Sequence, residues 1–183
     1  MSQIIIAPVR WADGPELVEA NTLNRAYHVP WVEPFTDMEG FESWFGLRVT
    51  GANISLVARD QSSCAVVGVI NINQIVWGSF RSAYLGYYGM SAFSRRGLMT
   101  EALRLSAGYA FQEIGLHRLE ANIQPENLAS IALVRRVGFR KEGFSPNYLQ
   151  VGGVWRDHER WALLASDFKG EARLHPAITG SGN

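Results

Sequence analysis

Segments of two kinds alternate along this chain, and their order limits the fold more than any other feature of the sequence. Runs rich in β-branched and aromatic residues predict strands, and amphipathic runs between polar or glycine-containing breaks predict helices. The predicted strands cover residues 4–10, 54–59, 66–72, 82–90, 118–123, 139–149 and 154–164. The predicted helices cover 16–26, 98–114 and 128–137, with a further helix that is capped by Asp37 and ends before Gly51. This order predicts an α/β (α+β) domain in which helices cover one mixed sheet.

Composition restricts the function classes. The chain has 183 residues, of which 47% are hydrophobic, and its 17 basic and 17 acidic side chains give a formal net charge of zero. A balanced charge argues against direct nucleic-acid binding and against an anionic membrane as partner. The lone Cys64 excludes an internal disulfide and a cysteine-rich metal site, so we expect no metal and a cytoplasmic location. Cys64 itself lies at the start of a predicted strand, where we expect it to pack in the core rather than to act as a nucleophile. The N-terminus carries no pattern of a secretory signal.

The junction between the strand over 82–90 and the helix over 98–114 is the candidate phosphate site. A helix N-terminus offers unpaired amides and a partial positive charge, which together bind a diphosphate without a metal ion. Gly97 would allow close approach, and Arg95 and Arg96 would add cationic partners. The alternative is a solvated loop in which Gly97 only makes a turn. Dinucleotide-binding and P-loop motifs are absent from the sequence.

Three sequence blocks carry a resemblance to a known family. They are Leu98-Met99-Thr100-Glu101-Ala102-Leu103, Asn127-Leu128-Ala129-Ser130 and Gly138-Phe139-Arg140-Lys141-Glu142-Gly143. In these blocks the chain resembles the GNAT acetyltransferase superfamily, whose acetyl-CoA loop has the pattern [QR]-x-x-G-x-[GA]; Ser94 and Met99 depart from it at the first and last positions. The segments 84–87 and 147–158 are similar to the branch of ribosomal-protein-alanine N-acetyltransferases.

The resemblance implies a single GNAT-like domain over residues 1–168, followed by a flexible tail over 169–183. Its central sheet would be mixed, mostly antiparallel, and splayed between the fourth and fifth strands, where the pantetheine arm of acetyl-CoA inserts. A backbone amide between Tyr88 and Met90 would hold the oxyanion. The cofactor-binding residues implied in this way are Tyr88, Gly89, Met90, Arg95, Arg96, Gly97, Leu98, Met99, Thr100 and Asn127.

The resemblance also suggests catalytic residues. Ser130 matches a serine proposed to protonate the coenzyme A thiolate, although Asn127 could simply cap a helix that carries Ser130 in its first turn. Related enzymes use glutamates as the base where this chain has Asn122 and Leu149. Glu120 is the nearest replacement, because it shares a strand face with Asn122, but it could equally pair with Arg118.

Two other segments carry candidates. His28 and Glu33 lie in a proline-containing loop with Trp31 and Phe35, which could form a substrate wall and could bring either residue to the substrate amine. Asp157 and His158 suggest a dyad, but in a run that follows a hairpin we expect them to shape an acceptor wall or to pair charges.

An α-amine acceptor would need only a modest base or a water chain, whereas a lysine acceptor would ask more of the base. With a reference pKa near 7.7–8.0, roughly a tenth of an α-amine is neutral at pH 7, against about 0.04% of a lysine. The resemblance implies acetyl transfer from acetyl-CoA to the N-terminal amine of a protein, with a ribosomal protein as the partner. Two alternatives stay open: acetylation of a small amine such as an antibiotic or polyamine, favoured by acidic residues near Glu33 and Asp37, and a non-catalytic acyl-CoA-binding factor. The sequence also allows the chain to form a homodimer.

Overall fold

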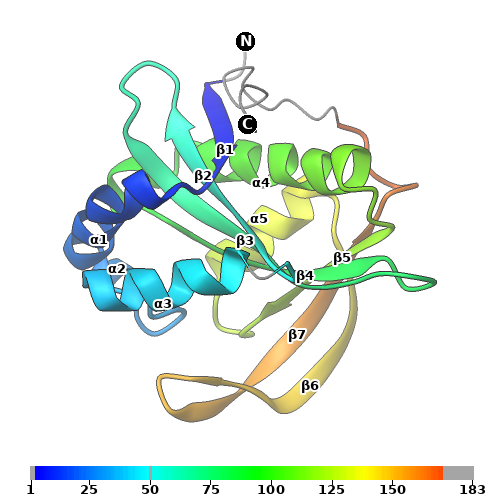
Figure 1. The fold of residues 1–183 in the computed structure, drawn as a ribbon. Coiled ribbons are helices and arrows are strands. Elements are labelled where there is room, and N and C mark those ends of the chain that lie inside the picture. The colour runs from blue at the N-terminus through cyan, green and yellow to red at the C-terminus, as the bar shows by residue number, and fades with distance from the viewer. Residues whose placement is uncertain (1–2, 50, 171–183) are drawn as a thin grey trace.

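A seven-stranded sheet runs through the computed structural model, which describes residues 3–49 and 51–170 (Figure 1). Its strands are β1 (Ile4–Pro8), β2 (Ile54–Asp60), β3 (Val66–Val76), β4 (Ser82–Gly89), β5 (Arg118–Ile123), β6 (Arg140–Val151) and β7 (Val154–Leu164). They lie in the order β1-β2-β3-β4-β5-β7-β6. Only β4 and β5 are parallel neighbours, and the other neighbouring pairs are antiparallel. The predicted mixed, mostly antiparallel sheet is confirmed.

The helices follow the prediction with two differences. They are α1 (Gly14–Leu23), α2 (Arg25–His28), α3 (Met38–Val49), α4 (Leu98–Gly108) and α5 (Leu128–Val137). The helix predicted over 16–26 is interrupted at Asn24, whose side chain donates to the Ala20 carbonyl and accepts from the Ser91 amide. A side chain that bonds to the backbone in this way competes with continuation of the helix. The helix predicted over 98–114 widens after Gly108 into a π-helical turn before Gly115, which has φ +79°.

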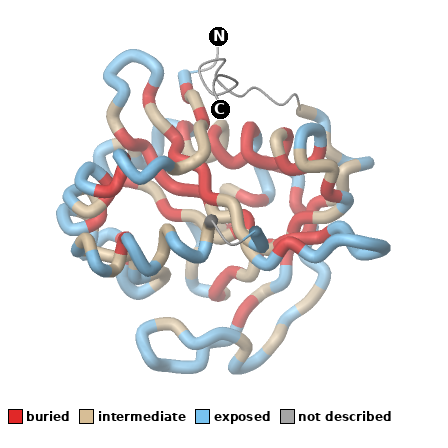
Figure 2. Tube along the Cα trace, in the orientation of Figure 1, coloured by how far each residue is buried: buried red, intermediate tan, exposed pale blue. Residues whose placement is uncertain are grey.

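Two apolar clusters lie on opposite faces of the sheet. Leu56 and Ile70 pack with α4 and α5, whereas their neighbours Val57 and Val69 pack with α1 and α3. Adjacent strand residues point to opposite faces, so the hydrophobic runs in β2 and β3 serve both clusters. Figure 2 shows this buried sheet between the helices, and it shows the β6–β7 hairpin projecting beyond them with mostly exposed residues.

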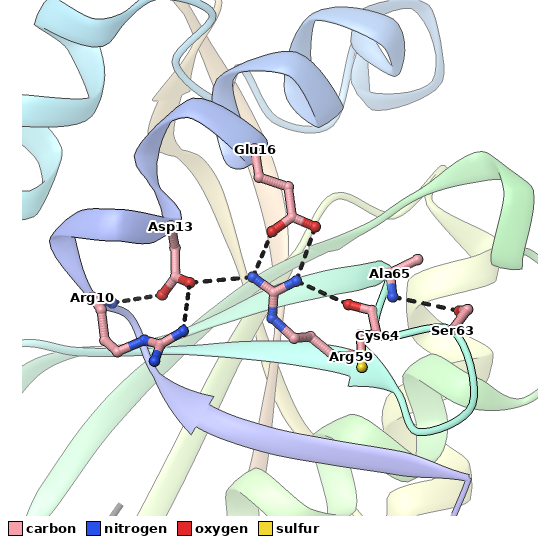
Figure 3. Close-up of polar contacts among 7 residues, drawn as sticks. All are labelled: Arg10, Asp13, Glu16, Arg59, Ser63, Cys64 and Ala65. Carbon is pink, nitrogen blue, oxygen red and sulfur yellow. Dashed lines mark hydrogen bonds and ion pairs between the residues drawn. The ribbon is translucent and has the colours of Figure 1, made fainter.

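Arg59 on β2 anchors the start of α1 to the sheet (Figure 3). Its guanidinium donates to Glu16 at 2.7 and 2.9 Å, to Asp13 at 3.2 Å and to the Cys64 carbonyl at 2.9 Å. The expectation of a packed Cys64 is wrong. Cys64 is exposed, because it occupies a left-handed position (φ +60°) in the turn between β2 and β3 rather than the strand itself.

β4 and β5 separate after a short ladder. Their pairing is limited to Ser82–Tyr84 with Arg118–Glu120, although β4 continues to Gly89 and β5 to Ile123. The predicted splay between the fourth and fifth strands is therefore confirmed, and it creates the space in which the candidate site lies.

Two expectations concern the chain as a whole: that it has no membrane-spanning helix, and that its domain ends near residue 168. Within residues 3–49 and 51–170, no helix is long and apolar enough to cross a membrane. Phe168 packs on Phe111 with ring centroids 5.5 Å apart. Most of the predicted tail, residues 171–183, lies outside the described residues, so the boundary at 168 stays a prediction.

Candidate active site

A cavity of about 140 Å³ lies where β4 and β5 part. Its lining comes from the proline-containing loop, from both strands, from the start of α5 and from β7. The lining residues are Trp31, Val32, Leu85, Gly86, Tyr87, Ala121, Asn122, Ile123, Gln124, Asn127, Ser130 and His158. Two predicted catalytic residues, Asn122 and Ser130, are thus brought together with Asn127.

Ser130 is hydrogen-bonded to a residue that the sequence did not single out. Its hydroxyl oxygen lies 2.5 Å from that of Tyr87. Asn127 caps α5 by accepting from the Ser130 amide at 3.1 Å, which confirms the capping interpretation and also fixes the serine at the cavity. Desolvation raises the pKa of Tyr87, and the hydrogen bond with Ser130 only partly opposes this. Tyr87 is therefore protonated at neutral pH.

Asn122 and Glu120 have different surroundings although they share a face of β5. The Asn122 Oδ1 atom is buried without a hydrogen-bond partner and its side chain lines the cavity. A buried acceptor without a partner is costly unless a ligand or water donates to it. Glu120 does not line the cavity and forms an ion pair with Arg118 at 2.8 Å. Of the two interpretations of Glu120, the structure therefore supports pairing with Arg118.

The amides at the end of β4 are not equivalent. The Met90 amide donates to the Val67 carbonyl at 2.9 Å, so it is not free to bind an oxyanion, and this part of the prediction needs correction. Hydrogen-bonded pairs alternate along an antiparallel ladder, so the Tyr88 amide also faces β3, whereas the Gly89 amide faces the side where β5 diverges. Gly89 remains the candidate oxyanion donor of the three.

The N-terminus of α4 retains the features of an anion site. Gly97 occupies the N-cap position with φ +78° and no side chain caps the helix. The first backbone hydrogen bond of this turn runs from the Glu101 amide to the Gly97 carbonyl at 3.1 Å. The amides of residues 98–100 therefore need partners from outside the helix.

The side chains of this turn are used in different ways. Leu98 is buried in the core, and Met99 packs over Gly68 and Gly89. These two residues can therefore serve a ligand only through their amides. Arg95 and Arg96 are exposed, with the Arg96 guanidinium carbon 5.4 Å from the centroid of the Phe93 ring.

The two base candidates of the proline-containing loop lie outside this cavity. His28 and Glu33 line a second, smaller cavity. His28 is buried, its Nε2 contacts the Gly89 carbonyl at 2.9 Å, and burial lowers its pKa against the opposing effect of that hydrogen bond. Trp31 and Val32 do form a wall of the main cavity, whereas Phe35 packs against Phe41 with ring centroids 5.4 Å apart.

His158 lies in the cavity wall, where its ring is buried. From the sequence we expected His158 to shape an acceptor wall or to pair charges. The local sequence pattern did not indicate that His158 and Ser130 line the same cavity. Among the described residues, no group of three or more histidine, cysteine, aspartate or glutamate side chains could hold a metal ion.

Comparison with known proteins places this arrangement in a family. Residues 3–140 match the model of the acetyltransferase (GNAT) domain. The chain belongs to the GNAT acetyltransferase family. It is 32% identical over 175 residues to the [ribosomal protein uS5]-alanine N-acetyltransferase of Escherichia coli, covering 91% of this chain and 90% of that one. This GNAT acetyltransferase is thus an acyltransferase.

Solved structures agree on the fold. RimJ of Mycobacterium smegmatis, in complex with CoA-disulfide, is 31% identical with a TM-score of 0.81, over 89% of this chain and 82% of that one. Spermidine N-acetyltransferase of Vibrio cholerae, in complex with CoA and spermine, is 19% identical with a TM-score of 0.79, over 91% and 98% of the chains. At that identity the second likeness concerns the fold alone. The unpaired amides at α4 and the cavity between β4 and β5 fit acetyl-CoA, the acetyl donor of the family.

Proposed function

We propose that this enzyme transfers an acetyl group from acetyl-CoA to the N-terminal α-amine of a protein, with a ribosomal protein as acceptor. One observation carries the proposal: a cavity lined by neutral hydrogen-bonding groups lies in the gap between β4 and β5, next to the N-terminus of α4. Met99 in the first turn of α4 packs directly over Gly89 at the end of β4, which brings the two parts together. The relatives that act on ribosomal-protein alanine favour the same acceptor.

In this proposal the N-terminus of α4 binds the diphosphate. The amides of residues 98–100 would donate to phosphate oxygens, and Arg95 and Arg96 would approach from the exposed side. When bound, acetyl-CoA supplies an activated acyl group as a thioester. The Gly89 amide would donate to the carbonyl oxygen of that group as negative charge develops on it.

Tyr87 and Ser130 would supply a proton to the departing thiolate. Their hydroxyls are in direct contact, and Tyr87 is held in its protonated form. Ser130 can therefore donate its proton and recover one from Tyr87. Asn122, whose buried oxygen has no partner among the described residues, would accept a hydrogen bond from the acceptor amine.

The charges around the cavity favour a single amine over a polyamine. None of the described residues that line the main cavity carries a carboxylate. Asp37 is engaged as a cap of α3, because it accepts from the Gly40 amide at 2.8 Å. Glu33 lies at the second cavity. A substrate with several ammonium groups would leave most of them unpaired here, which is costly on burial.

Thiol release from acetyl-CoA tests the proposal against its alternatives. Peptides beginning with Ala or Ser would be compared with the same peptides blocked at the N-terminus, and with spermidine, and the products identified by intact mass. We expect turnover only with free N-termini. Turnover with spermidine alone would favour the small-amine alternative, and cofactor binding without turnover of any amine would favour an acyl-CoA-binding factor.

A further inference from the structure

We propose that His158 is the base that removes a proton from the acceptor amine, an assignment that rests on the proposed function. His158 is 3% exposed and lines the cavity together with Asn122 and Ser130. The Asn122 amide in this lining cannot serve as a base at neutral pH, so the proton acceptor must come from another position. His158 on β7 occupies the wall of the same cavity.

The hydrogen bond of the imidazole determines which nitrogen faces the substrate. The His158 Nδ1 atom lies 2.9 Å from the Arg156 carbonyl oxygen. A carbonyl can only accept, so Nδ1 carries the hydrogen and Nε2 keeps its lone pair in the neutral ring. The backbone of β7 thus fixes both the ring and its tautomer, as a second partner commonly does for a reactive histidine.

Elimination within the cavity points to the same residue. Among the described residues of the lining, only Tyr87 and His158 titrate, and Tyr87 stays protonated. His158 is therefore the described residue of the lining whose side chain offers a nitrogen lone pair as proton acceptor.

Residues from three strands contact the imidazole or line the cavity with it. Tyr148 on β6 has its ring centroid 6.1 Å from that of His158, Tyr87 lies on β4, and Asn122 lies on β5. On β7, alternation places the exposed Arg156 and Arg160 on the face of His158. The adjacent carboxylates are engaged elsewhere: Asp157 accepts from the Asn147 amide at 2.8 Å, and Glu159 forms an ion pair with Lys141 at 2.5 Å.

The proton balance of the transfer follows from these positions. The lone pair of His158 Nε2 takes one proton from the acceptor ammonium and leaves a neutral amine. The amine nitrogen then forms a bond to the acyl carbon while the carbon–sulfur bond breaks and its electron pair leaves with sulfur. As that bond forms, the amine nitrogen loses a second proton to water, and Ser130 and Tyr87, which give one proton to the thiolate, regain one from water. The amide keeps the third, and the imidazolium returns its proton to water.

The test is the pH dependence of His158→Gln, with His117→Gln as a matched control. His117 is exposed and lies outside the cavity. At pH 7 we expect kcat/KM of His158→Gln for an Ala-starting peptide to fall about 10-fold, because roughly a tenth of the α-amine is already neutral without a base. Above about pH 9 the α-amine is neutral without a base, so the difference from wild type should close. Coenzyme A binding and the His117→Gln profile should not change.

A loss that stays constant across pH would indicate a structural role and overturn the assignment, and so would a variant as active as wild type. A wild type that acetylates no peptide would instead refute the proposed function.

Chemical modification of the wild-type enzyme tests the same assignment if the His158→Gln variant does not fold. Diethyl pyrocarbonate acylates neutral imidazole, so inactivation should follow modification of His158, as located by mass spectrometry, and an acceptor peptide should protect. Full activity after His158 is modified would also overturn the assignment.

Discussion

The hydroxyl oxygens of Tyr87 and Ser130 lie 2.5 Å apart, although 43 residues separate them in the sequence. Tyr87 comes from the strand that borders the gap in the sheet, and Ser130 from the first turn of the helix that follows β5. Desolvation raises the pKa of the tyrosine, so the pair holds a transferable proton throughout the neutral range.

Removing either hydroxyl should slow the transfer. We expect Ser130→Ala and Tyr87→Phe each to lower kcat about 100-fold. The double variant should lose little more than a single one, because residues that act as a unit are not additive. Thiol release at saturating acetyl-CoA measures the rates, with Ser79→Ala, at an exposed position outside the cavity, as control. A Ser130→Ala enzyme with wild-type rates across pH would contradict the proton-donor role.

The two arginines before α4 should affect binding rather than chemistry. In the double variant Arg95→Ala with Arg96→Ala we expect KM for acetyl-CoA to rise about 10-fold with kcat unchanged, because contacts to the diphosphate are the same in ground and transition states. Acetyl-pantetheine lacks the diphosphate and serves as the control substrate, and its KM should not change. An equal rise in KM for acetyl-CoA and acetyl-pantetheine would indicate that these arginines do not contact the diphosphate.

Replacement by alanine should change the free energy of unfolding in opposite directions at two glycines. A Cβ at Gly68 would lie 2.5 Å from the Met99 sulfur and 2.5 Å from the Tyr88 carbonyl oxygen, so Gly68→Ala must separate β3 from β4 and should cost about 3 kcal/mol. A Cβ at Gly46, inside α3, meets nothing within 4 Å, and Gly46→Ala should gain about 0.5–1 kcal/mol. Urea unfolding measures both. A Gly68→Ala protein as stable as wild type would contradict the close contact between the strands.

Asp60 should make stability sensitive to acid. The hydroxyls of Ser62 and Ser63 and the Ser63 amide donate to its carboxylate and lower its pKa to about 2. Because this value lies below that of the unfolded chain, near 3.9, the stabilisation is present above about pH 4 and is lost as the pH falls towards 2. As the pH is lowered from 5 to 2.5, the urea concentration at the unfolding midpoint should therefore fall less steeply for Asp60→Asn than for the wild type. Parallel slopes would show that the turn does not stabilise the ionised form.

Local signals predicted most of the fold. The hydrophobic runs in β2 and β3, the glycine before α4 and the Asn127 cap each depend on neighbours close in sequence, so the elements they define were found nearly where they lie. The errors arose where one side chain redirects the backbone. The Asn24 side chain bonds to the Ala20 and Ser91 backbone and interrupts a helix, and Cys64 adopts a left-handed turn conformation that its sequence context does not specify.

The candidate site was predictable only in part, because it is assembled from segments far apart in the chain. Ser130 and Asn122 were identified from the resemblance. Tyr87 was missed as a catalytic candidate, and His158 was expected to shape an acceptor wall or to pair charges, since only the packing of β4 and β7 around the cavity brings them to it. Whether Glu120 acts as a base or pairs with Arg118 could be decided only from the structure, in which the two side chains form an ion pair.

A crystal structure with bound acetyl-CoA tests the central claim most directly. We predict that the diphosphate lies against the amides of residues 98–100, and that the thioester enters the gap between β4 and β5 within hydrogen-bonding distance of the Gly89 amide, with its sulfur near Ser130. A diphosphate bound away from the N-terminus of α4, or an acyl group outside the gap, would contradict the claim.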